Sequence, residues 1–118
     1  MTNFRVDSRV VGDVAVLYPQ GYLNNIVTEK LEKECGVYLK KGYRKIVLNF
    51  NSIEFINSIG ISVLLGIIEK VKGSDAGLYF TNVSRLQEET FEMLGLNKYM
   101  RIYQSEDEAL REIQGDGL

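Results

Sequence analysis

The residues best placed to do chemistry are Asn57 and Ser58, a polar pair inside the apolar segment IEFINSIGISVLLGII at residues 53–68. The apolar residues that follow predict a helix that starts near Ser58. The start of a helix favours an anion, so a phosphate on Ser58 could accept hydrogen bonds from the backbone amides of residues 59–61. Serine and asparagine are also common helix N-caps, so the pattern equally fits a cap with no further function.

Other catalytic or ligand-binding patterns are scarce. The chain contains no histidine, which excludes Ser-His-Asp and Cys-His catalysis and the HExxH zinc site. Neither GxGxxG nor GxxxxGK(S/T) occurs, so no phosphate-cradling loop is predicted. Ser58 could act as a nucleophile on a strand-to-helix turn, but NSIG lacks the first glycine of a GxSxG elbow and no base lies near in sequence. We therefore expect a protein that is not an enzyme and binds no cofactor or metal.

Length and composition indicate one domain, spanning residues 1–118. The chain is 45% apolar and its net charge is −2, which gives no reason to expect direct binding to nucleic acid or to an anionic membrane. The longest apolar run, Ile59–Ile68, is shorter than the roughly 20 residues that span a bilayer. The N-terminus has no apolar signal-peptide region, and the single cysteine, Cys35, is expected in the core. These features lead us to expect a cytoplasmic protein.

The alternation of apolar residues and the turn signals predict the order of the elements. Strands are predicted at residues 4–7, 14–19, 44–50, 76–81 and 98–103. Helices are predicted at residues 26–41 and 58–73, from Ser84 to Gly95, and from Ser105 onwards, with capping boxes at both serines. The segment GYLNN at residues 21–25 is predicted as a loop, and residues 111–118 as a frayed tail. The order ββαβαβαβα indicates an α/β domain with a mixed, mainly parallel sheet.

The helix after Ser58 is predicted to have an apolar patch on its outer side. At about 100° per residue, the side that faces the sheet carries Gly60, Ile61, Leu64, Leu65, Ile67, Ile68 and Val71. The outer side carries Ile59, Ser62, Val63, Gly66, Glu69 and Lys70. Ile59 and Val63 beside the small residues Ser62 and Gly66 would form a flat surface suited to a protein partner. Alternatively, a neighbouring loop covers Ile59 and Val63.

Three segments together resemble the STAS domain, the family of anti-sigma-factor antagonists. They are IVLNFNSIEFINSIGISVLLG, the earlier GYLNN, and TNVSRLQEETFEMLGLNKYMRIYQSEDEAL near the C-terminus. The resemblance covers nearly the whole chain and implies a single STAS-like domain. It further implies that Ser58 is phosphorylated by a partner that is both anti-sigma factor and serine kinase. A metal-dependent serine phosphatase would reverse the modification.

The resemblance thus implies a regulator of transcription that works by partner switching. The unmodified protein would bind the anti-sigma factor and free the sigma factor, and phosphorylation would release it. ATP and metals would belong to the partners, so this chain would be a substrate and a ligand. The partner-binding residues implied are Asn24, Asn57, Ile59, Gly60, Ser62, Val63 and Gly66.

Two residues depart from the family pattern, because Asn24 and Asn57 stand where the family commonly has aspartate. Both are expected at the same edge of the sheet, after neighbouring strands. An asparagine amide can donate to a phosphate, which would favour the phosphorylated form. Alternatively, the kinase needs the carboxylates and this chain is a poor substrate. The second outcome favours a different function, a phosphorylation-independent STAS scaffold or adaptor in a larger signalling or transport complex.

Overall fold

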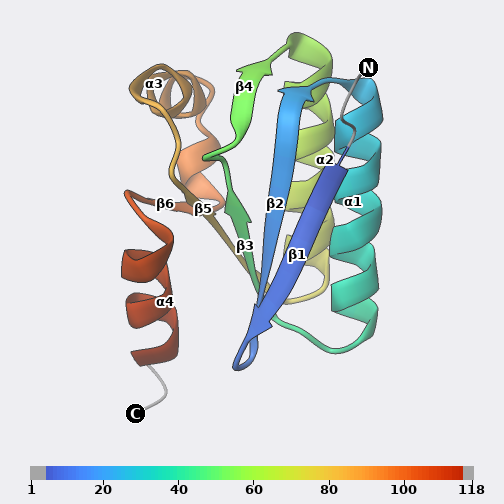
Figure 1. Ribbon diagram of the computed structural model, residues 1–118, viewed down its shortest axis with the longest axis vertical. Coiled ribbons are helices and arrows are strands. Elements are labelled where there is room, and N and C mark those ends of the chain that lie inside the picture. Colours follow the sequence, from blue (N-terminus) through green and yellow to red (C-terminus); the bar gives the residue numbers. More distant parts are fainter. Residues whose placement is uncertain (1–4, 116–118) are drawn as a thin grey trace.

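The computed structural model describes residues 5–115, apart from the side chains of residues 25, 26 and 115 (Figure 1). Its elements are β1 (Arg5–Val11), β2 (Val14–Leu23), α1 (Asn25–Lys40), β3 (Lys45–Asn49), β4 (Ile53–Ile56), α2 (Ser58–Gly73), β5 (Gly77–Thr81), α3 (Arg85–Met93), the 3-10 turn η1 (Leu96–Lys98), β6 (Arg101–Tyr103) and α4 (Glu106–Gly115). The sheet has the order β1-β2-β3-β5-β6, and β4 pairs with β2. The β1–β2 pair is antiparallel, and the other described pairs are parallel. The predicted α/β class is confirmed, with β4 as an additional strand.

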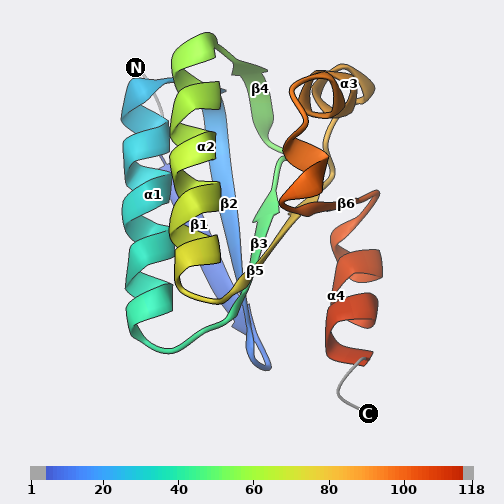
Figure 2. The same cartoon turned by 180° about the vertical axis from the view of Figure 1, so that it is seen from behind.

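Helices lie on both faces of the sheet. α1 and α2 lie side by side on one face, and α4 packs against the other (Figures 1 and 2). α3 lies beyond the carboxyl end of β5, at the same end of the molecule as the start of α2 (Figure 1). Between residues 5 and 115, no helix combines the length and the apolar character needed to cross a membrane.

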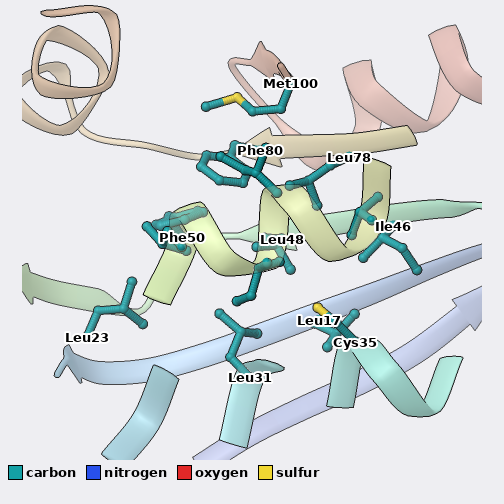
Figure 3. Packing of buried hydrophobic residues seen from close by; sticks show 14 of the residues in the cluster. Leu17, Leu23, Leu31, Cys35, Ile46, Leu48, Phe50, Leu78, Phe80 and Met100 are labelled. Carbon is teal, nitrogen blue, oxygen red and sulfur yellow. The ribbon is translucent and has the colours of Figure 1, made fainter. Parts of the chain in front are cut away.

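The two faces of the sheet contribute to two apolar cores. Ile46 and Leu48 of β3 point into the larger core, which lies under α1 and α2 (Figure 3). Val47, between them, points to the opposite face, where α4 lies. Because both faces of β3 are covered, its residues Ile46, Val47 and Leu48 are apolar in succession, without the alternation of a half-exposed strand. The smaller core comprises Val14, Val16, Val47, Ala109 and Ile113.

Three phenylalanine rings hold α3 against the sheet. Phe91 of α3 is fully buried and meets Phe50 and Phe80, with ring centroids 5.8 and 5.4 Å away. The Phe50 and Phe80 rings are themselves 4.7 Å apart. Contacts of this kind stabilise by burial and by ring geometry together, so α3 has a fixed position despite its short length.

β2 is longer than predicted, and most of GYLNN is strand rather than loop. The strand continues through Pro19 to Leu23. Pro19 lies between the part of β2 that pairs with β3, which ends at Leu17, and the part that pairs with β4, which begins at Gly21. Its missing N–H therefore removes no hydrogen bond on that side. The register shifts after Gly21, whose φ is 90°, and this shift lets the end of β2 pair with β4.

Local capping explains where the last elements begin. At Ser84 the predicted capping box is present, because the Gln87 amide donates to Ser84 Oγ (3.1 Å) and the Ser84 amide donates to Gln87 Oε1 (2.9 Å). At Ser105 only the first bond of the predicted capping box is present, because the Glu108 amide donates to the Ser105 hydroxyl (3.1 Å). The Glu108 carboxylate accepts from the Gln104 amide (3.1 Å) instead of the Ser105 amide. The predicted strand at 98–103 is reduced to β6, since η1 occupies its first residue.

A polar network centred on Glu106 attaches α4 to the sheet. The carboxylate of Glu106 pairs with the Arg9 guanidinium and accepts from the Tyr18 hydroxyl (3.0 Å) and Asn49 Nδ2 (2.9 Å). Burial alone would raise the pKa of Glu106, but the hydrogen bonds from Arg9, Asn49 and Tyr18 outweigh it and lower the pKa. α4 continues to Gly115, so residues 111–115 are helical where fraying was expected, and residues 116–118 lie outside the described residues.

Replacing Glu106 with glutamine is expected to lower the free energy of unfolding by about 1–3 kcal/mol at pH 7, because the charged pair with Arg9 is lost. The folded-state pKa of Glu106 lies below its ordinary value of 4.5. The contribution of the carboxylate is therefore complete above that value and disappears as the pH falls through the folded-state pKa. Urea unfolding at pH 7 and pH 3 measures the difference, with Glu112→Gln on the same helix as the control. An equal loss at both pH values would contradict the expectation.

Candidate functional site at the start of α2

Ser58 is exposed and is the first residue of α2, directly after the N-cap Asn57. Asn57 Oδ1 accepts from the Gly60 amide (2.7 Å), and the Asn57 carbonyl accepts from the Ile61 amide (3.0 Å). In the described part of the chain, the first-turn amides left without an acceptor are those of Ser58 and Ile59. Of the three amides predicted to bind a phosphate on Ser58, that of Ile59 has no acceptor in the unmodified chain, whereas those of Gly60 and Ile61 already bond to Asn57.

Asn24 and Asn57 have the same structural role at the starts of two helices. Asn24 Oδ1 accepts from the Val27 amide (3.3 Å), three residues on, as Asn57 Oδ1 does from Gly60. The two caps lie at one edge of the sheet, as predicted, because the preceding residues Leu23 and Ile56 pair across β2 and β4. Aspartate caps helices about as well as asparagine, so an asparagine here preserves the local geometry and changes the charge.

Gly60 lets the first turn of α2 approach the end of β2. It is buried, and a Cβ at this position would lie 2.1 Å from the Leu23 carbonyl oxygen. The Asn57 amide donates to the same carbonyl oxygen at 3.4 Å. Gly60 therefore positions Ser58, and it does not itself offer a surface to a partner.

The predicted outer patch of α2 is divided by the neighbouring helix. Ile59 (51% exposed) and Ser62 face solvent. Val63 packs against the larger core, and Gly66 is half-buried beside α1, where a Cβ would lie 3.6 Å from Glu32 Oε2. Leu65, predicted to face the sheet, is instead exposed. The reason is that α2 packs against α1 as well as against the sheet, so the buried side of α2 includes the residues that face α1.

Two exposed aromatic residues extend the surface beyond α2. Tyr22 and Phe55 are each 58% exposed, and their rings meet edge to face at 6.1 Å. They are partners in the pairing of β2 with β4. Phe55 was missed because β4 was not predicted, although an aromatic residue in the short run IEFI was a usable signal. Phe55 lines a groove together with Ser58, and Ile59 follows Ser58 in the first turn of α2 and is also exposed. We call the surface that carries Tyr22, Phe55, Ser58 and Ile59 the Ser58 face.

A groove of about 200 Å³ separates β4 from α3 beside the Ser58 face. Ser58 and Phe55 line one part of it, and Leu86 of α3 lines another. Leu86 is 73% exposed, which is unusual for a leucine on a helix that packs against a core. The groove brings α3 into the candidate site, and no local sequence pattern indicated this because β5 separates α2 from α3 along the chain.

The Ser58 hydroxyl has no side-chain partner among the described residues that surround it. A nucleophilic serine is activated by a base within hydrogen-bond reach, and the described residues place no such bond on Ser58. Within residues 5–115, no three histidine, cysteine, aspartate or glutamate side chains gather closely enough to hold a metal ion. Cys35 lies in the core as predicted, and burial raises the pKa of its thiol to about 12.

Comparison with known proteins identifies relatives along nearly the whole chain. The STAS domain family model matches residues 5–109. A candidate anti-sigma factor antagonist of Thermotoga neapolitana, a homologue of TM1081, is 34% identical over 111 residues, which cover 91% of this chain and 96% of that relative. The anti-sigma-F factor antagonist RsfB of Mycobacterium tuberculosis is 27% identical over 104 residues, covering 86% and 83%. The crystal structure of TM1081 from Thermotoga maritima superposes with a TM-score of 0.81 at 26% identity, covering 92% and 93%.

Gly60→Ala is expected to lower the free energy of unfolding by about 3 kcal/mol or more, because the new methyl group would collide with the Leu23 carbonyl. Gly66→Ala is the matched control, since its methyl group would make an ordinary contact and alanine favours a helix interior by about 1 kcal/mol. Urea unfolding of the two variants should therefore give changes of opposite sign. A similar change in both would show that the approach of α2 to β2 is looser than described.

Asn57→Ala is expected to destabilise the protein by about 1 kcal/mol, because the Gly60 amide loses its acceptor. Asn57→Asp should retain full stability or gain a few tenths of a kcal/mol, since a carboxylate caps equally well and suits the positive end of the helix. Thermal unfolding measures both variants. Equal losses in the two would mean that residue 57 does more in the folded chain than cap α2.

Proposed function

Because the chain belongs to the STAS domain family, we propose that it is an anti-sigma factor antagonist that binds its partner through the Ser58 face. The observation that carries the proposal is the exposed Ser58 at the start of α2, on the same end of the sheet as the exposed Tyr22–Phe55 pair and next to the exposed Ile59. Exposed apolar groups that gather around one polar group are typical of protein-binding surfaces. The names of two relatives, both antagonists of anti-sigma factors, support the same function.

We further propose that phosphorylation of Ser58 controls this binding. The partner would be an anti-sigma factor with serine kinase activity, and a metal-dependent serine phosphatase would restore the hydroxyl. The ATP and the metal belong to those proteins, and this chain acts in the cytoplasm without contacting nucleic acid or membrane itself. It thereby regulates transcription through protein contacts alone.

The physical effect of the modification follows from where Ser58 lies. A phosphate adds about −1.5 to −2 charges at neutral pH and must keep its hydration or find donors. The free amides of Ser58 and Ile59 can supply two hydrogen bonds in the unbound chain. Contact with a partner would remove the remaining water from the phosphate, which costs free energy. If the binding free energy becomes less favourable by a few kcal/mol, the affinity falls a hundredfold or more. No change of fold is required.

The asparagines bear on the choice between this switch and a phosphorylation-independent scaffold. Both Asn24 and Asn57 cap helices through their side-chain oxygens, so the replacement of aspartate does not distort the presentation of Ser58. What changes is the charge beside the hydroxyl. This favours the switch, because the serine keeps its geometry and its phosphate meets no capping carboxylate.

Phosphorylation of Ser58 can be tested with the purified serine-kinase anti-sigma factors encoded in the same genome, incubated with the protein, ATP and Mg²⁺. Mass spectrometry should show the addition of one phosphoryl group, lost in Ser58→Ala and retained in Ser62→Ala, an exposed serine one turn along α2. No addition, or an addition that persists in Ser58→Ala, would refute the switch.

Binding distinguishes the switch from the scaffold. Ser58→Asp should weaken binding to the anti-sigma factor by about a hundredfold, and Ser74→Asp, at the opposite end of α2, by much less, as measured by calorimetry. If Ser58→Asp binds as tightly as the unaltered chain, the Ser58 face is not the regulated surface and the scaffold function is favoured.

A further inference from the structure

The groove beside Ser58 has a rigid floor and an exposed wall. Phe91 is fully buried and held by the rings of Phe50 and Phe80, so it forms a fixed base. Leu86 rises above it with most of its surface in solvent. The residues that line the groove are Glu54, Phe55, Ile56, Asn57, Ser58, Ile61, Ser84, Leu86, Gln87, Thr90 and Phe91.

The volume of the groove indicates what it can hold. At about 200 Å³ it lies below the roughly 300–1,000 Å³ of sites for small molecules and cofactors. Its wall and floor are apolar, and they suit a single apolar side chain that enters from a partner's surface. Side chains buried in such pockets near the centre of an interface carry a large share of the binding energy.

The polar groups along the groove restrict the occupant further. The side chains of Asn57, Ser84, Gln87 and Thr90 already bond to backbone groups of their own helices. Ser58 and Glu54 are the lining polar residues whose side chains have no hydrogen bond or ion pair with other described residues. The bonds of Asn57 and Gln87 engage only their side-chain oxygens, so their amide NH2 groups can still donate. Glu54 is the carboxylate among the lining residues, and a carboxylate at the edge of an apolar pocket is best matched by a cation.

We propose that this groove receives an apolar side chain of the anti-sigma factor that is flanked by a lysine or arginine, which pairs with Glu54. The inference rests on the function proposed above and names the chemistry of that partner. The charges of α3 agree with a basic partner, because Arg85 is paired with Glu89 and leaves Glu88 and Glu92 in excess. Because Ser58 and Glu54 both line the groove, a phosphate on Ser58 would project into it and exclude the incoming side chain. This supplies a steric basis for release of the partner.

The test measures the dissociation constant for the anti-sigma factor that modifies Ser58, using variants at the groove. Leu86→Ala should raise the dissociation constant about tenfold or more, as truncation of a central apolar residue does. Glu54→Gln should raise it severalfold at low salt and less at high salt, because the lost pair is electrostatic. Met93→Ala on α3 and Glu112→Gln on α4 are the controls, since both residues are exposed and neither lines the groove. Both controls should bind as the unaltered chain does.

A crosslinking experiment identifies the occupant directly. A photo-crosslinking amino acid in place of Leu86 should capture a partner peptide in which an apolar residue lies within a turn of a lysine or arginine. Phosphorylation of Ser58 should abolish the crosslink.

The outcomes separate this inference from the proposed function. If the partner binds and Ser58→Asp releases it, but Leu86→Ala and Glu54→Gln leave the dissociation constant within about twofold, the groove is not used and the switch stands. A captured peptide without an adjacent basic residue would overturn the assignment of Glu54. If no anti-sigma factor binds the unaltered chain, the proposed function and this inference both fail.

Discussion

The close contact between the first turn of α2 and the end of β2 determines where the rest of the candidate surface lies. Because Gly60 has no Cβ, the helix can begin against the Leu23 carbonyl, which also accepts from the Asn57 amide. Asn57 then caps the helix, and Ser58 is the first residue that can point into solvent. Any larger residue at position 60 would push α2 outward and move the hydroxyl away from Tyr22 and Phe55.

The Ser58 face is exposed to solvent, but the strands and helices that carry it are fixed by contacts in the interior of the protein. The phenylalanine cluster fixes α3, the pairing of Tyr22 with Phe55 joins β2 to β4, and the Glu106 network holds α4 on the opposite face. A partner therefore meets a preformed shape and loses little affinity to ordering of the backbone. A single modification can act on such a surface locally, by charge and by bulk, without transmitting a rearrangement.

The sequence was informative where the signal was local. The helix at residues 26–41 was predicted within one residue of α1, and the start of α2 followed from the apolar run after Ser58, because caps and periodicity act over a few residues. β4 was missed since its four residues continue into that same apolar run and its partner lies thirty residues earlier, beyond Pro19. The outer face of α2 was partly misplaced at Val63 and Leu65, because a helical wheel contains no information about the neighbouring helix α1. The groove combines β4, α2 and α3, so no single segment could predict it.

The burial of Cys35 has a practical consequence for studying this surface. It is the one cysteine in the sequence, and with a pKa near 12 its sulfur is almost entirely protonated at neutral pH and shielded by the core. Maleimide dyes should therefore ignore the native chain and label a cysteine placed at an exposed position such as Tyr22. A single introduced cysteine can therefore be labelled specifically, and its fluorophore can follow the binding and dissociation of a partner in real time.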